Sequence, residues 1–524
     1  MLLLGRCLIV TLLLLPRVAL QAALRLPSVL SDHMVLQGNM EEVPIWGWAE
    51  PGEKLVVAFA GHRIETTTRS DGTWRVNLPR LVPQAAGEDL TITGTEQRVI
   101  RDVLVGEVWL CSGQSNMAMQ MKGRHGQVDR ADEEIAAAHH PTLRLFDFDE
   151  VYDIYRLAVP PDKAESDRPG RWIRCTPETA ARFIALGYYV GRELQRAQPG
   201  AAVGLVNSSV GGTPIEAWTS LPAQQAVPAL QALLSDWNRR LEGYDPAREQ
   251  AAANLARETW TRERKAAAAA GQTPPKAPPA FKNLRVSTPA GLFHSLIAPL
   301  VPFRLRGVLW YQGERNAAGP YTELYGLQLE TMVRDWRAHW GQELFFAWVQ
   351  LPAFQRPQRE PSEPKGWGVW VRDGQRRALR LPQTGMAITL DLGDATVGHP
   401  TNKADFGRRL ALVLRHRVYE EPLAFWSGPV FRSAHAEGGR MVVSFDQADG
   451  LRARAGELTG FAVADERGAF RWAQAHIEGS RVVVSHPEIA RPTAVRYGWA
   501  ANPNGNLVNG GGLPASPFAT DDGR

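Results

Sequence analysis

Apolar and polar positions form three patterns along the chain, and each predicts its own kind of element. In the first hundred residues, short runs such as VPIWGWA (43–49) and WRVNLP (74–79) are rich in β-branched and aromatic residues. Turn formers separate these runs, as in PGE at 51–53, which is typical of hairpins in an all-β module. We therefore expect an N-terminal β-sandwich over residues 23–100.

In the middle of the chain, buried-strand patterns alternate with helical ones. The strand candidates are VLVGEVWL (103–110), AAVGLVNSSV (201–210), FRLRGVLWYQG (303–313), LFFAWVQL (344–351) and TGMAITLDLGD (384–394). Helical spacing of apolar residues runs through 178–197, 321–340 and 402–419. Strands alternating with helices predict an α/β fold over 101–420, with a parallel sheet covered on both faces.

Two further segments depart from this alternation. Residues 231–282 are Ala-rich, charged and helix-prone, and they end in the Pro-rich connector QTPPKAPPAFK. They predict a helical hairpin or lid inserted into the α/β domain, or a solvated excursion without a role. From 421 to 524, runs such as RMVVSFD (440–446) and RVVVS (481–485) predict a second β-sandwich.

The N-terminus has the features of a signal peptide over residues 1–22. Arg6 precedes an apolar core that ends at Pro16, and cleavage fits after Ala22. An uncleaved anchor is the alternative. No later segment is long and apolar enough to span a membrane, so we expect a periplasmic or secreted protein without membrane contact after cleavage.

The net charge, the cysteines and the histidines indicate which classes of partner and cofactor the protein is expected to bind. The net charge is +4 and falls to about +2 without Arg6 and Arg17, and no dense Lys/Arg block occurs, so nucleic acid is not an expected partner. Cys111 and Cys175 remain after cleavage and form either one disulfide or two buried thiols. The twelve histidines include no HExxH pattern, so neither a metal nor another cofactor is expected.

Candidate chemistry sits where the strands end, which is where sites form in open α/β sheets. In CSGQSNM (111–117), Ser115 follows a strand and precedes a predicted helix. This position exposes the hydroxyl and directs backbone N–H groups toward a substrate. Met117 stands where a G-x-S-x-G elbow has glycine, so the motif is not that of α/β-hydrolases. An ordinary turn serine is the alternative.

Two further strand ends carry groups that could stabilise an oxyanion. In NSSVGGTPIEAW (207–218), Gly211 and Gly212 allow close backbone approach, or simply form a tight turn. In WYQGERN (310–316), the amides of Gln312 and Asn316 are possible donors, or they tie loops together. Glu314 of the same motif is a candidate buried acid or substrate contact.

The fourth strand end, DLGDATVGHPTNK (391–403), supplies a histidine. Pro400 follows His399, which places His399 on a loop where it can act as a base near neutral pH. Asp391 and Asp394 lie upstream of it. Taken alone, a loop histidine is more often an ordinary surface residue.

The motifs CSGQSNM, VGGTPIEAW, WYQGExN and DLGD…HPxNK together resemble the sialate O-acetylesterase family. The resemblance extends to LPSVLSDHMVLQ, GLFHSLIAPLVP and the closing GLPASPF, and it covers nearly the whole mature chain. It implies a flavodoxin-like SGNH-type hydrolase domain, with Ser115 as nucleophile and His399 as base. It also assigns the glycine turn, Gln312 and Asn316 to the oxyanion site.

One departure leaves the acid of the triad open. Family members usually carry an aspartate just before the catalytic histidine, whereas Thr396, Val397 and Gly398 precede it here. We choose Asp394 because it is near in a flexible loop. Asp391, Glu314 and a Ser–His dyad without an acid are the alternatives.

The resemblance implies a secreted enzyme that removes O-acetyl groups from sugars, of the sialic acid or the hemicellulose and xylan type, by way of an acyl-enzyme. A catalytically weakened glycan-binding protein on the same scaffold is the second hypothesis, favoured by the missing aspartate. Another SGNH esterase, such as a lipase or thioesterase, is the third. The expected partner is an acetylated carbohydrate.

Overall fold

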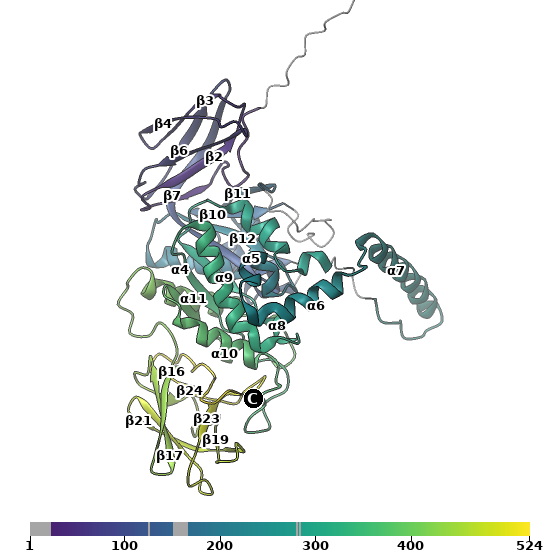
Figure 1. Ribbon diagram of the computed structural model, residues 1–524, viewed down its shortest axis with the longest axis vertical. Coiled ribbons are helices and arrows are strands. Elements are labelled where there is room, and N and C mark those ends of the chain that lie inside the picture. The colour runs from purple at the N-terminus through teal and green to yellow at the C-terminus, as the bar shows by residue number, and fades with distance from the viewer. Residues whose placement is uncertain (1–22, 124–125, 150–165, 279–280, 282–283, 524) are drawn as a thin grey trace, which may run out of the picture.

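Three parts of the chain follow one another along the long axis of the molecule (Figure 1). The structure, a computed structural model, describes residues 23–123, 126–149, 166–278, 281 and 284–523. An N-terminal group of strands, a central α/β domain and a C-terminal group of strands lie in chain order. The predicted signal peptide lies outside the described residues. Within them, no helix is long and apolar enough to cross a membrane.

The central sheet has the order β11-β10-β12-β7-β13-β14-β15. Its strands are β7 (Gln97–Gly113), β10 (His140–Phe148), β11 (Gly170–Cys175), β12 (Val203–Ser209), β13 (Gly307–Tyr311), β14 (Phe345–Val349) and β15 (Thr384–Ala387). All five predicted strands are present and parallel, in the spatial order 2-1-3-4-5, which is the order of flavodoxin-type sheets.

The prediction of a wholly parallel sheet is wrong at one edge. β10 adds a parallel strand beside β12, and β11 then pairs with β10 in the antiparallel direction. A strand that is next in the chain can return antiparallel beside its predecessor, whereas a parallel neighbour needs a crossover to the other end of the sheet. The sheet is therefore mixed.

Helices cover both faces of this sheet, as the alternation of side chains on β13 shows. Tyr311 stacks on Phe406 of α11, with ring centroids 5.8 Å apart, whereas its neighbour Trp310 packs edge-on against Trp336 of α9 at 6.0 Å. Successive strand residues point to opposite faces, so α11 and α9 lie on opposite sides. α4 packs beside α11, and α10 beside α9.

Helices are present in all three segments where the spacing of apolar residues predicted them. The central domain contains α1 (Ser115–Ala118), α2 (Ala131–Ala136), α3 (Pro177–Arg182), α4 (Ala185–Ala197), α5 (Leu221–Gln225), α8 (Glu314–Ala317), α9 (Tyr325–Trp340), α10 (Val369–Arg377) and α11 (Lys403–Arg417). The helix predicted over 178–197 is in fact two, because Phe183 and Ile184 leave the helical path to bond the segment at 120–121.

The N-terminal strands are continuous with the central sheet. They are β1 (Val35–Gln37), β2 (Val43–Trp48), β3 (Lys54–Phe59), β4 (His62–Thr67), β5 (Thr73–Leu78) and β6 (Gln84–Thr93). The first half of β7 pairs with β6 and the second half with β12 and β13. The predicted boundary between residues 100 and 101 therefore falls inside a strand that serves both parts.

The C-terminal part contains two four-stranded sheets, β16-β17-β22-β21 and β20-β19-β23-β25, which contribute to one apolar core. Its strands are β16 (Val430–Glu437), β17 (Arg440–Asp446), β18 (Arg452–Ala453), β19 (Phe461–Ala464), β20 (Phe470–Trp472), β21 (Gln474–Glu478), β22 (Arg481–Ser485), β23 (Ala494–Tyr497), β24 (Leu507–Val508) and β25 (Phe518–Ala519). The buried Arg372 of α10 joins it to the central domain by donating to the carbonyls of Ala500 and Ala501.

The insert begins with α6 (Gln231–Leu241) and continues with α7 (Pro246–Ala269). α6 packs through Leu233, Leu234 and Trp237. α7 has no buried residue and projects away from the central domain (Figure 1). α7 is therefore solvated along its length, and the role of the insert stays a prediction.

Candidate active site

Ser115 lies where β7 turns into α1, at the carboxyl edge of the sheet. The preceding Gly113 has φ +139°, and a Cβ there would lie 2.1 Å from the carbonyl oxygen of Tyr311, so this close approach requires glycine. The N–H of Gln114 donates to the same carbonyl at 3.0 Å. The serine is 8% exposed. The turn therefore fixes Ser115 between β7 and α1, as the sequence predicted, but the residue is buried rather than exposed.

The glycine turn after β12 lies beside this position. The N–H of Val210 donates to the carbonyl of Gly113 at 3.0 Å. Gly212 has φ +76°, a conformation that favours glycine. The hydroxyl of Thr213 closes the turn by donating to the carbonyl of Val210 at 2.8 Å. Gly211 and Gly212 thus follow directly after a contact with the Ser115 turn.

The amides of the third strand end are bonded to the other strand ends. Gln312 Nε2 donates to Asn316 Oδ1 at 2.7 Å, to the carbonyl of Thr213 at 3.1 Å and to Gln114 Oε1 at 3.2 Å. Asn316 Nδ2 donates to Glu216 Oε2 at 3.0 Å. These are the contacts of amides that tie loops together. Their role as oxyanion donors stays a prediction.

Glu314 joins a second polar group, which includes Asn116, the residue after Ser115. Asn116 Nδ2 donates to Glu314 Oε1 at 2.6 Å and to the carbonyl of Gly398 at 3.0 Å. Lys403 Nζ donates to Asn116 Oδ1 at 2.7 Å. The residue after the serine is therefore bonded to the residue before His399.

Burial dominates the electrostatics of this group. It raises the pKa of Glu314, although the bonds from Asn116 and from the Glu314 backbone and the charge of Lys403 act in the opposite direction. It lowers the pKa of Lys403 to about 7, although Glu314 favours the charged amine. Both side chains are buried away from water, so the charged form of each is stabilised only by the polar atoms around it.

Asp394 lies in the loop that carries His399, residues 391–402, here called the His399 loop. It is exposed, and its Oδ1 accepts hydrogen bonds from the N–H of Thr396 at 2.7 Å, the hydroxyl of Thr396 at 2.8 Å and the N–H of Val397 at 2.8 Å. The bond from the Thr396 N–H is the largest of the effects that lower the pKa of Asp394. Asp394 thus shapes the loop, and its role as the acid stays a prediction.

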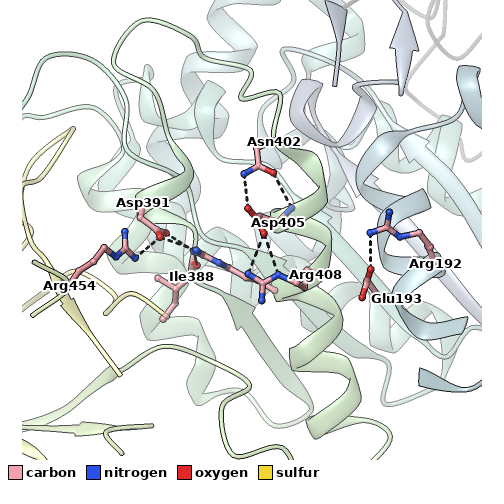
Figure 2. A network of polar contacts seen from close by, with 9 residues as sticks. Arg192, Glu193, Ile388, Asp391, Asn402, Asp405, Arg408 and Arg454 are labelled. Carbon is pink, nitrogen blue, oxygen red and sulfur yellow. Dashed lines mark hydrogen bonds and ion pairs between the residues drawn. The ribbon is translucent and has the colours of Figure 1, made fainter. Parts of the chain in front are cut away.

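Asp391 fixes the start of the His399 loop. It pairs with both terminal nitrogens of Arg409 on α11, at 2.5 and 2.9 Å, and with Arg454 of the C-terminal part at 2.6 Å (Figure 2). Burial by itself would raise the pKa of Asp391, but the two arginines outweigh burial and hold it below its ordinary value. The start of the loop therefore joins the central and C-terminal parts.

Asn402 fixes the end of the loop. Its side chain caps α11, accepting from the N–H of Asp405 at 3.2 Å and donating to the Asp405 carboxylate at 2.7 Å, and Arg408 pairs with the same carboxylate (Figure 2). Asparagine is a preferred N-cap because its oxygen satisfies a free N–H of the first turn. His399 therefore lies in a loop whose start and end are both held in place by polar contacts.

Four buried polar residues of the site were not singled out from the sequence: Gln114, Asn116, Glu216 and Lys403. All four lie inside motifs that the sequence analysis quoted, and this is the signal that could have found them. Among the described residues, no group of three or more His, Cys, Asp or Glu side chains could hold a metal ion.

The two cysteines that the sequence left open are free thiols. Cys111 and Cys175 are both buried and unpaired with each other. Burial raises the pKa of the Cys175 thiol to about 12. Burial therefore disfavours the reactive thiolate form of both cysteines.

Comparison with known proteins identifies the family. Residues 105–242 and 294–415 match the family described as carbohydrate esterase, sialic acid-specific acetylesterase. The crystal structure of a carbohydrate acetylesterase from Xanthomonas citri is 34% identical, with a TM-score of 0.75 and coverage of 95% of this chain and 100% of its own.

Curated relatives agree with this match. The sialate O-acetylesterase of Mus musculus is 26% identical over 94% of this chain and 93% of its own length. That of Homo sapiens is 27% identical over 78% and 73%, respectively. Fold and comparisons together define a carboxylic ester hydrolase. The chain belongs to the sialate O-acetylesterase family of carbohydrate esterases, as its motifs predicted.

Proposed function

We propose that this protein hydrolyses O-acetyl esters of sugars through an acetyl-enzyme formed on Ser115, with His399 as the base. The hydrogen bond from Asn116 to Gly398 carries the proposal, because it joins the neighbours of the two reactive residues, which are 284 positions apart in the chain. The names of the relatives, which are carbohydrate and sialate O-acetylesterases, support the substrate class.

The reaction has two halves. Ser115 Oγ attacks the acetyl carbonyl carbon while His399 takes its proton, and the sugar oxygen leaves with that proton as the ester bond breaks. Water, deprotonated by His399, then attacks the acetyl-enzyme and releases acetate and free Ser115. The N–H groups of Ser115 and of the Gly211–Gly212 turn stabilise the oxyanion in both halves, together with an amide of the Gln312–Asn316 pair.

Asp394 is the proposed acid that orients His399. It lies in the same loop, five positions earlier, and only its Oδ1 takes part in the turn bonds to Thr396 and Val397. Asp391 is engaged by two arginines, and Glu314 by Asn116. These engagements favour Asp394 over the other two carboxylates.

The surrounding architecture is part of the proposal. The central domain, residues 101–420, is a flavodoxin-like SGNH hydrolase domain, and the parts at 23–100 and 421–524 are β-sandwiches that brace it. The strand order of the central sheet and the shared core of the two C-terminal sheets support this assignment. Residues 1–22 direct the chain to the periplasm or the outside of the cell.

The test is acetate release by the protein lacking residues 1–22, from acetylated xylan and from O-acetylated sialic acid. We expect the wild type and Ser235→Ala, an exposed serine on α6, to release acetate at equal rates. Ser115→Ala should release almost none, because the acetyl-enzyme cannot form. If wild type and Ser115→Ala are equally inert while both bind the glycan, the protein is a glycan-binding protein and the proposal fails.

A further inference from the structure

Lys403 is the residue of the HPTNK motif that the proposed reaction does not use. Its side chain is fully buried, although lysine is almost never buried without a partner. Its amine lies 5.1 Å from the ring of Phe406 and 5.5 Å from that of Tyr311, and it donates to Asn116 Oδ1 at 2.7 Å. A buried amine that meets one asparagine beside the nucleophile needs an explanation.

Three of the four hydrogen-bonding positions of the Asn116 amide are occupied. Its oxygen accepts from Lys403, and its nitrogen donates to Glu314 Oε1 at 2.6 Å and to the Gly398 carbonyl at 3.0 Å. An ammonium group can only donate, and a carboxylate or carbonyl oxygen can only accept. A flipped amide would turn its N–H groups toward Lys403 and its oxygen toward two acceptors. Lys403, Glu314 and the Gly398 carbonyl therefore favour the same orientation of the Asn116 amide, and Lys403 is the partner that holds its oxygen.

We propose that Lys403 is a positioning residue for the reaction, acting through Asn116 to hold the base-bearing His399 loop against the nucleophile turn. The bond from Asn116 to Gly398 is the contact that it orients, and that contact lies next to Ser115 on one side and next to His399 on the other. This inference rests on the proposed function, because it assigns a role to a residue in that same site.

The anchors at the two ends of the loop explain why a central contact is needed. Asp391 and Asn402 fix the ends, and Asp394 shapes the first turn. Residues 396–398 are nevertheless exposed, and the bond from Asn116 to the Gly398 carbonyl ties this stretch to the nucleophile turn. Misplacement of a reacting group by about 1 Å lowers turnover by roughly a hundredfold.

A double-mutant cycle tests the proposal, with p-nitrophenyl acetate as substrate and rates expressed per folded protein from circular dichroism. Lys403→Met and Asn116→Leu each remove one partner at nearly constant volume. We expect each to lower kcat roughly ten- to a hundredfold while KM stays within about twofold. The double variant should be no slower than Asn116→Leu, because a residue that acts through another adds nothing once that residue is gone.

Arg417→Met is the matched control, because Arg417 is exposed and lies at the other end of the same helix, away from the His399 loop. Its kcat should equal that of the wild type. If Lys403→Met does not fold, the same cycle is run in a Glu314→Gln background, where no buried carboxylate is left without a cation.

A kcat for Lys403→Met within about twofold of the wild type would overturn the inference, as would independent effects that multiply in the double variant. In either case an active wild type and an inactive Ser115→Ala would leave the proposed function standing. A wild type that releases no product from p-nitrophenyl acetate and no acetate from acetylated xylan or O-acetylated sialic acid would overturn both.

Discussion

Replacing Asp391 by asparagine removes the charge that holds the start of the His399 loop between α11 and the C-terminal part. The side chains of Asp391 and Arg409 are 15% and 8% exposed, so this pair is largely buried. Breaking such a pair from one side costs about 3–5 kcal/mol. Asparagine keeps one acceptor oxygen, and Arg454 is 44% exposed and rehydrates, so we expect about 3 kcal/mol.

The effect should depend on pH in a defined direction. Arg409 and Arg454 hold the pKa of Asp391 below its ordinary value of 3.8 in the folded protein, against the effect of burial. A carboxyl whose pKa is lowered on folding stabilises the protein fully above the unfolded value and loses that contribution as the pH falls through the folded value. The difference between wild type and Asp391→Asn should therefore be constant above about pH 5 and shrink below about pH 4.

Thermal unfolding between pH 7 and pH 3 measures this difference, and hydrogen exchange of the loop amides locates it. Asp446→Asn is the matched control, because Asp446 pairs with Arg432 at 3.7 Å with both side chains more than half exposed. Its effect should stay below about 1 kcal/mol. Equal effects of the two substitutions at pH 7, or a difference for Asp391→Asn that persists unchanged at pH 3, would refute the reasoning.

Asp394→Asn keeps the oxygen that accepts the turn bonds from Thr396 and removes only the charge. If Asp394 orients His399, its kcat should fall by about a hundredfold or more, and a kcat equal to that of the wild type would exclude it as the acid. Both mature cysteines should resist a thiol reagent such as Ellman's until the protein unfolds, because both are buried and the pKa of Cys175 is raised to about 12. One thiol that reacts in the native protein would contradict that placement.

The central strands could be predicted because buried parallel strands are continuous apolar runs. β10 was missed because Arg144 and Asp147 interrupt its apolar run. Arg144 is buried in the structure by pairing with Asp102 at 3.0 Å. A partner 42 positions away satisfies the charge, and local pattern does not reveal such a partner.

The candidate site could be predicted because four motifs follow four parallel strands, and parallel strands bring their carboxyl ends to one edge. The hydrogen-bond partners of each side chain could not be predicted from the sequence. The side-chain amide of Gln312 is the kind of group that can donate to an oxyanion. In the structure, however, its N–H groups donate to Asn316 and to the carbonyl of Thr213. Lys403 has the appearance of an exposed helix residue, and only the tertiary fold brings it to Asn116, 287 positions away.

The most direct test of the central claim is to stop the reaction with acid during turnover of an acetylated sugar and to analyse the peptides by mass spectrometry. We predict one acetyl group on the peptide that contains Ser115 in the wild type, and none in Ser115→Ala. Steady acetate release with no acetyl group on that peptide, or with the acetyl group on another residue, would contradict the account.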